Sequence, residues 1–141
     1  MNERDTGRQI LVDLMGAPYL DQRDEQRNAF NAPLQDYSDE VCFGRVWGRD
    51  GIDKKLRSIL NLAILTALNR PAQLKHHLQG ALNNGCTPEE IQEILLHTAV
   101  YCGLPAAGEA FKVAEGVLRE RGLIPVDSSD STGPGARVDA S

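Results

Sequence analysis

The sequence lacks the features that redox, secreted and membrane proteins usually carry. Its three cysteines, Cys42, Cys86 and Cys102, form neither a CxxC pair nor an even disulfide set, so we expect reduced structural thiols. No apolar run approaches the roughly 18 residues that a membrane span requires, and the polar start MNERDTGRQ lacks the apolar core of a secretory signal. We therefore expect a cytoplasmic protein that does not act at a membrane.

An excess of basic residues is also missing. Fifteen lysines and arginines stand against 20 aspartates and glutamates, which gives a net charge of −5. This balance argues against nucleic acid or an anionic membrane surface as the main partner and favours a small ligand. With 141 residues, the chain has the size of one domain, and its 41% hydrophobic content is just enough for one core. We therefore expect partners to cover part of its apolar surface.

Helical signals dominate what is present, and no strand alternation or internal repeat competes with an all-α fold. The clearest boundary is the capping box TPEE, in which Thr87 is the cap and Glu90 lies three residues after it. Apolar periodicity together with Pro, Gly and cap signals predicts helices over residues 7–15, 21–31, 34–44, 53–68, 71–85, 87–102 and 104–121.

The stretch ILNLAILTAL, residues 59–68, is apolar nearly all round. Its helix must therefore be buried on most sides, in an oligomer interface or a central hairpin. From Gly122 onward the sequence is small, polar and turn-rich, so we expect at least the second half of this segment to be a disordered tail. These signals predict one helical domain over residues 1–121 and a largely disordered tail over residues 122–141.

Two of the three histidines are adjacent in the stretch LKHHLQGALNNG, and adjacent residues on a helix point about 100° apart. Four residues of this stretch form one apolar stripe on a helical wheel: Leu74, Leu78, Ala81 and Leu82. His76 lies almost opposite the stripe and His77 lies at its edge, so His77 is the candidate for an interior site. The alternative is a boundary histidine that bonds a backbone carbonyl.

His97 lies one turn after Glu93 and one turn before Tyr101. A carboxylate at this spacing could orient the ring or raise its pKa, which would make His97 a possible acid near neutral pH. The alternative is an exposed pair of little consequence. No HxxxH or HExxH spacing occurs, so we do not expect a metal site.

A basic segment interrupts the acidic chain between Arg45 and Arg57. Five cations lie there against two aspartates: Arg45, Arg49, Lys54, Lys55 and Arg57. With Trp47 as a flat apolar wall, the segment could hold a small cyclic anion, and the alternative is a solvated turn with a core tryptophan. Because Arg57 lies one turn into the most apolar helix, where an unpaired guanidinium would be costly, it should meet Glu40, another carboxylate or a bound anion.

Two long stretches carry a family resemblance: GRVWGRDGIDKKLRSILNLAILTALNR and LKHHLQGALNNGCTPEEIQEILLHTAVYCGLPAAGEAF. In sequence and order they resemble the 4-carboxymuconolactone decarboxylases of the alkylhydroperoxidase D-like superfamily, over about residues 36–120. The resemblance implies a helical bundle of about six helices, assembled into a homohexamer, that acts without metal or organic cofactor. The implied reaction converts 4-carboxymuconolactone to the enol-lactone of 3-oxoadipate and CO2 in the protocatechuate branch of the β-ketoadipate pathway.

The redox members of this superfamily carry the motif CxxCxxxH, whose histidine matches His77. The two cysteine places hold Arg70 and Gln73, which puts peroxidase-type chemistry in doubt. Two alternatives to the decarboxylase stay open at this point: an alkylhydroperoxidase-like thiol peroxidase and a non-catalytic helical binding module.

The reaction implied by the resemblance requires cations and one acid. Arg49 and Arg57 would contact a carboxylate or the developing oxyanion, and His77 would protonate or polarise the carbonyl. Glu40 would orient a basic partner, and His97 is a second candidate for the acid.

Three further residues are candidates for contact with the substrate. Trp47 and Tyr101 would form walls around it, and Arg45 would contribute to binding. The expected ligand is a small lactone dicarboxylate.

Overall fold

A computed structural model describes residues 1–126, and its regular structure is entirely helical. Seven α-helices and one π-helix follow one another within this part of the chain: α1 (Glu3–Met15), α2 (Ala17–Glu25), α3 (Ala32–Tyr37), η1 (Ser38–Val46), α4 (Lys54–Ala67), α5 (Pro71–Asn83), α6 (Pro88–Cys102) and α7 (Leu104–Glu120). The predicted all-α class is confirmed. None of these helices combines the length and the apolar character that crossing a membrane requires. Most of the predicted tail, residues 127–141, lies outside the described residues.

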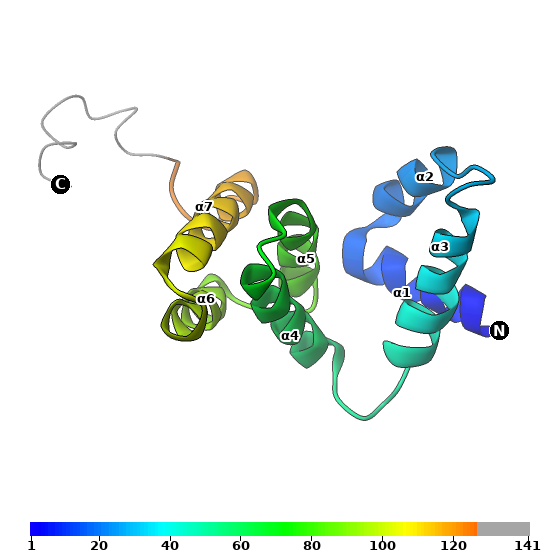
Figure 1. The fold of residues 1–141 in the computed structure, drawn as a ribbon, viewed down its shortest axis with the longest axis horizontal. Helices are drawn as coiled ribbons and strands as arrows, with labels where there is room; N and C mark the ends of the chain where they lie inside the picture. The colour runs from blue at the N-terminus through cyan, green and yellow to red at the C-terminus, as the bar shows by residue number, and fades with distance from the viewer. Residues whose placement is uncertain (127–141) are drawn as a thin grey trace, which may run out of the picture.

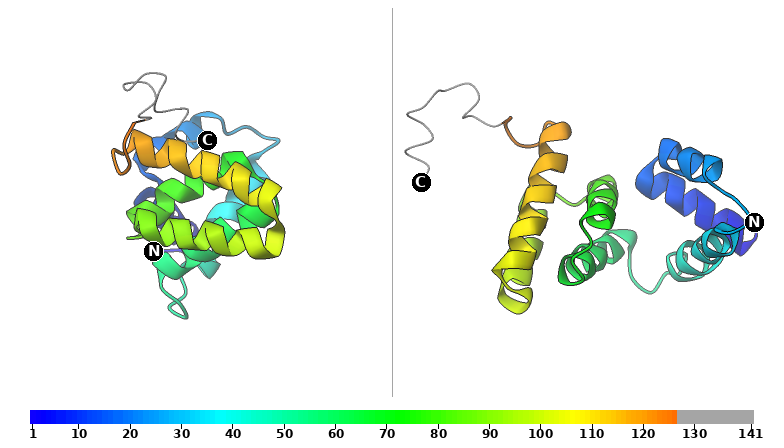
Figure 2. Two further views of the ribbon diagram at one scale, coloured as in Figure 1. Left: turned by 90° about the vertical axis from the view of Figure 1, so that its left-hand side faces the viewer. Right: turned by 45° about the horizontal axis from the view of Figure 1, so that its top comes forward.

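The helices form an N-terminal group, α1 to η1, and a C-terminal group, α4 to α7 (Figure 1). In Figures 1 and 2, α4 and α5 lie between the α6–α7 pair and the N-terminal helices. Each group has its own core. Leu62, Leu78 and Leu95 are fully buried in the C-terminal core, whereas Leu11 and Leu14 are buried in the N-terminal one.

Helix α1 joins the two groups by packing against α5. A Cβ atom at Gly80 would lie 2.6 Å from a methyl carbon of Leu14, and the Asn83 amide donates a hydrogen bond of 2.7 Å to the Leu14 carbonyl. Glycine at position 80 therefore lets α1 approach α5 closely. The small residues after His77 make room for another helix of the same chain.

The predicted ends of the C-terminal helices are confirmed where a local cap defines them. Asp53 accepts a hydrogen bond of 2.8 Å from the Leu56 amide, and Thr87 and Glu90 form the reciprocal capping box. The helix predicted to end at Gly85 ends at Asn83, and Gly85 follows with a positive φ of 97°, the left-handed conformation in which glycine commonly terminates a helix.

The prediction for the N-terminal helices was less accurate. The helix predicted over residues 21–31 begins at Ala17 and ends at Glu25. Asn28 and Asn31 end it, because their side chains bond backbone groups of the turn that follows. The helix predicted over residues 34–44 divides into α3 and the π-helix η1.

Helix α4 is only half buried within a single chain. Its inner face buries Ser58, Leu62 and Thr66. The opposite face carries four large apolar side chains at four-residue intervals, each 41–59% exposed: Leu56, Leu60, Ile64 and Leu68. The burial on most sides that the sequence predicts therefore requires something beyond residues 1–126.

Candidate functional site

His77 lies on the face of α5 that meets α4. Its side chain is partly buried, and its Nδ1 lies 3.3 Å from the side-chain nitrogen of Asn61 on α4. His76 is exposed and points instead toward α2, where its ring meets the Tyr19 ring edge-on at 5.1 Å. The predicted difference in burial between the adjacent histidines is confirmed. The partner of His77 is the Asn61 side chain on α4. The alternative interpretation, a boundary histidine, expected a backbone carbonyl instead.

Arg57 lies one turn before Asn61 on α4, so the two side chains share a face of that helix. The Arg57 side chain is partly buried, and its Nε is buried without a hydrogen-bond partner among residues 1–126. Within the same residues it forms no ion pair, and Glu40 is exposed on η1. A buried donor without an acceptor is costly, so Arg57 is available to an anion that enters from outside the chain.

The other cations of the basic segment are dispersed. Arg45 is exposed and its Nε lies 2.6 Å from a carboxylate oxygen of Glu3, which lowers the pKa of that carboxyl group. Lys55 pairs with Glu90 at 2.9 Å. Arg49 is exposed in the turn between η1 and α4. In the described part of the chain, Arg57 is therefore the cation of this segment that carries a buried donor without a partner.

The three remaining candidates lie apart from His77. Trp47 is buried in the N-terminal core, where its ring centroid lies 5.6 Å from that of Phe43. His97 and Tyr101 are exposed on α6 with ring centroids 5.0 Å apart. Within one chain, Trp47 thus has the core position that the alternative interpretation expected, and the His97–Tyr101 pair faces outward.

Burial changes the proton affinity of His77. Loss of hydration lowers the pKa of the ring from 6.5 to about 4, and the neighbouring His76 adds to the effect. The imidazole is therefore neutral near pH 7, with one nitrogen that donates and one that accepts. This state suits polarisation of a carbonyl oxygen or passage of a proton, whereas a cationic acid would need a higher pKa.

We expect this buried neutral ring to make folding stability depend on pH. As the pH falls from 6.5 to about 4, the unfolded chain binds a proton at His77 that the folded chain does not, so stability falls over this window and levels off below it. The loss should approach about 3 kcal/mol per chain. Chemical unfolding across the window, compared between wild type and His77→Gln, isolates the effect from the titration of carboxyl groups. Parallel curves for the two proteins would contradict it.

The cysteines do not form the paired, activated thiols of a peroxidase in this structure. All three are free, and burial raises the pKa of the Cys42 and Cys86 thiols. Cys102 is exposed at the end of α6 and has no cysteine partner. A thiol peroxidase needs a low-pKa thiol beside a second one, so this arrangement disfavours that alternative. Within residues 1–126, no three histidine, cysteine or acidic side chains come close enough together to hold a metal ion.

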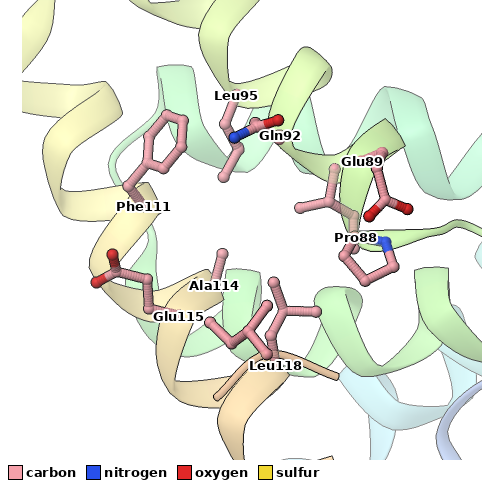
Figure 3. A pocket seen from close by; sticks show the side chains of 10 residues that line it. Pro88, Glu89, Gln92, Leu95, Phe111, Ala114, Glu115 and Leu118 are labelled. Atoms are coloured by element: carbon pink, nitrogen blue, oxygen red, sulfur yellow. The ribbon is translucent and has the colours of Figure 1, made fainter. Parts of the chain in front are cut away.

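A hollow of about 250 Å³ opens between α6 and α7 (Figure 3), and His77 is not among the residues that line it. Its walls are largely apolar, with Leu95, Phe111 and Leu118 among them, and two carboxylates, Glu89 and Glu115, lie at its sides. None of the residues among 1–126 that line it is basic. An anionic substrate would be repelled here, so the partly buried contact between α4 and α5 remains the better candidate site.

Asn61 is the residue at this contact that the sequence analysis did not single out. It interrupts the apolar stretch ILNLAILTAL. Because a buried amide must find a hydrogen-bond partner, a polar residue in so apolar a helix is the signal that could have identified it.

Comparison with known proteins gives three findings. The sequence model of the carboxymuconolactone decarboxylase family matches residues 32–116. The chain is 34% identical over 119 residues to a 4-carboxymuconolactone decarboxylase from Acinetobacter baylyi, an alignment that covers 84% of this chain and 89% of the relative. It is 36% identical over 116 residues to a nitrosuccinic acid decarboxylase from Metarhizium robertsii, which covers 82% of this chain and 81% of that one.

Proposed function

The chain belongs to the carboxymuconolactone decarboxylase family, and from that premise we propose that it converts 4-carboxymuconolactone to 3-oxoadipate enol-lactone and CO2 without a cofactor, in the catabolism of protocatechuate. The single observation that carries this proposal is the contact between α4 and α5. There the partly buried, neutral His77 of α5 contacts the face of α4 that also carries Arg57, whose Nε has no hydrogen-bond partner among residues 1–126.

The substrate explains why such a site would suffice. It is an unsaturated five-membered lactone whose carboxylate lies on a ring carbon conjugated to the lactone carbonyl. The bond to the carboxylate carbon breaks, CO2 leaves, and the electron pair moves through the double bond onto the carbonyl oxygen. A proton then adds to the ring carbon next to the carbonyl. The protein must stabilise the dienolate oxygen, hold the second carboxylate and manage this proton.

Each of these tasks has a candidate residue. The Arg57 guanidinium would hold a carboxylate or the oxyanion through a charge-assisted bond. The neutral His77 ring would donate to the carbonyl oxygen as negative charge develops there, and would pass the proton. Arg49 would attract the second carboxylate from the exposed turn that precedes α4. Glu40 as an orienting group and His97 as an acid stay predictions.

A second substrate deserves a parallel assay because one relative is a nitrosuccinic acid decarboxylase. Nitrosuccinate is also a dicarboxylate, and loss of CO2 beside its nitro group places negative charge on the nitro oxygens. The same pair of a guanidinium and a neutral donor would stabilise that charge. In both reactions a dicarboxylate loses CO2, and the electron pair moves onto the oxygen of an electron-withdrawing group, a carbonyl in the lactone and a nitro group in nitrosuccinate.

The test is an assay of both substrates with EDTA present throughout. We expect the ultraviolet absorbance of the lactone to change on addition of the protein and CO2 to be released. Turnover of nitrosuccinate alone would overturn the proposed substrate. Turnover of neither by a correctly assembled protein would favour the binding module instead.

We also expect a stable homo-oligomer, with the hexamer of the resemblance as the proposed state. The exposed row of four apolar residues on α4 is the physical reason, since a lone soluble chain seldom leaves such a surface uncovered. Sedimentation at micromolar concentration should show the assembly, and Leu60→Lys with Ile64→Lys should reduce its size. The matched change Glu109→Lys on α7 should leave it intact. A monomeric wild type would refute the expectation.

A further inference from the structure

The contact between Asn61 and His77 indicates which nitrogen of the His77 ring carries the proton. The atoms 3.3 Å apart are the Asn61 amide nitrogen and Nδ1 of the ring. An amide nitrogen carries two hydrogens and can only donate. Nδ1 must therefore accept, which leaves the single proton of the neutral ring on Nε2.

The position of that proton decides what His77 can do. The two ring nitrogens point in nearly opposite directions, so a bond from α4 to Nδ1 leaves Nε2–H directed away from Asn61. In the other tautomer, Nε2 would be an acceptor and would repel a developing oxyanion. The tautomer of His77 therefore decides whether Nε2 can stabilise negative charge on the substrate.

We propose that Asn61 is a positioning residue that holds His77 in the Nε2–H tautomer, so that Nε2–H donates to the oxyanion formed when CO2 leaves. This inference rests on the proposed function for its catalytic part. Its structural part, the tautomer, can be measured in the resting protein without any substrate.

Two replacements of Asn61 change the tautomer in different ways. Asn61→Asp offers only acceptors, so the ring must place its proton on Nδ1 to bond with it. Asn61→Leu keeps a similar volume without polar atoms, so neither tautomer is held. We expect both variants to turn over the lactone at least 10-fold more slowly than wild type. The aspartate should be the slower one, because a wrong tautomer costs up to about 10⁴ in kcat in serine-protease triads.

A matched control lies at the other end of the same helix contact. The Asn84 amide, just after α5, donates to the Ser58 hydroxyl on α4 at 3.1 Å. Asn84→Asp therefore makes the same chemical change between the same two helices, away from His77. It should leave both the His77 tautomer and turnover unchanged.

The experiment is a two-bond ¹H–¹⁵N correlation spectrum of the full chain labelled at histidine nitrogens, recorded near pH 7. The chain has only three histidines, so His76→Gln and His97→Gln assign the His77 signals by elimination. We expect a protonated Nε2 and a bare Nδ1 in wild type and in Asn84→Asp. Asn61→Asp should show the reverse, and Asn61→Leu a mixture.

The outcomes separate this inference from the proposed function. A protonated Nδ1 in wild type overturns the inference before any variant is made, and so does an unchanged spectrum in Asn61→Leu. If the tautomer shifts as expected while kcat stays constant, the catalytic part fails. If wild type shows the expected tautomer but does not turn over the lactone, the proposed function fails and the structural part stands.

Discussion

Replacing His77 by alanine is expected to lower the turnover of 4-carboxymuconolactone by on the order of 100-fold or more, whereas His76→Ala should stay within a few fold of wild type. The reason is the difference in their surroundings. His77 is partly buried against α4 with an ordered side-chain partner, and His76 is exposed beside Tyr19. A group that donates to the oxyanion stabilises the transition state more than the substrate, so its loss should appear mainly in kcat.

Initial rates over a range of lactone concentrations measure this difference. Melting curves of the same proteins control for folding, because His77→Ala also removes a partly buried side chain. His77→Gln is a gentler second variant that keeps polar atoms on α5. Equal losses of kcat in the two alanine variants would show that the orientation of this helix does not decide which histidine acts.

The C-terminal helices could be predicted well because their ends depend on local chemistry. The capping box at Thr87, the Asp53 cap and the left-handed Gly85 each satisfy backbone groups within a few residues of themselves. The direction of His77 followed in the same way from a helical wheel. These predictions needed no knowledge of how the helices pack.

The N-terminal helices could not be predicted as well, because long-range charge pairs shape them. Asp39 is fully buried in the π-helix and forms ion pairs with Arg8 of α1 and Arg23 of α2. The approach of α1 to η1 also depends on Gly7, where a Cβ atom would lie 1.8 Å from the Asp39 carbonyl oxygen. Nothing in the local sequence indicates that these residues meet.

The same distinction between local signals and long-range packing applies to the candidate site. The sequence indicates Arg57 because a guanidinium in an apolar helix is costly, and its Nε is buried without a hydrogen-bond partner among residues 1–126. Its proposed pairing with Glu40 depended on the packing of two separate helices, and Glu40 is exposed on η1. The bond from Asn61 to His77 joins residues 16 apart on two helices, and a single sequence does not show such a pairing.

The Arg57 side chain offers the second large effect. Arg57→Lys keeps the positive charge but loses the planar fork that binds a carboxylate through two bonds, so we expect kcat/KM for the lactone to fall at least 10-fold. Arg57→Met removes the charge as well and should lower it further. Lys112→Met, an exposed change of the same chemical kind on α7, controls for the loss of one positive charge and should leave the rate unchanged.

Stability should respond to these changes differently from activity. Because Arg57 forms no ion pair within residues 1–126 and its Nε lacks a partner there, methionine should relieve an unfavourable burial. The ligand-free Arg57→Met oligomer should therefore melt no lower than wild type. If Arg57 were a structural partner of a buried carboxylate, methionine would leave that group unpaired, at a cost of about 3 to 5 kcal/mol. Melting temperature and turnover would then fall together, and the substrate-binding role of Arg57 would be refuted.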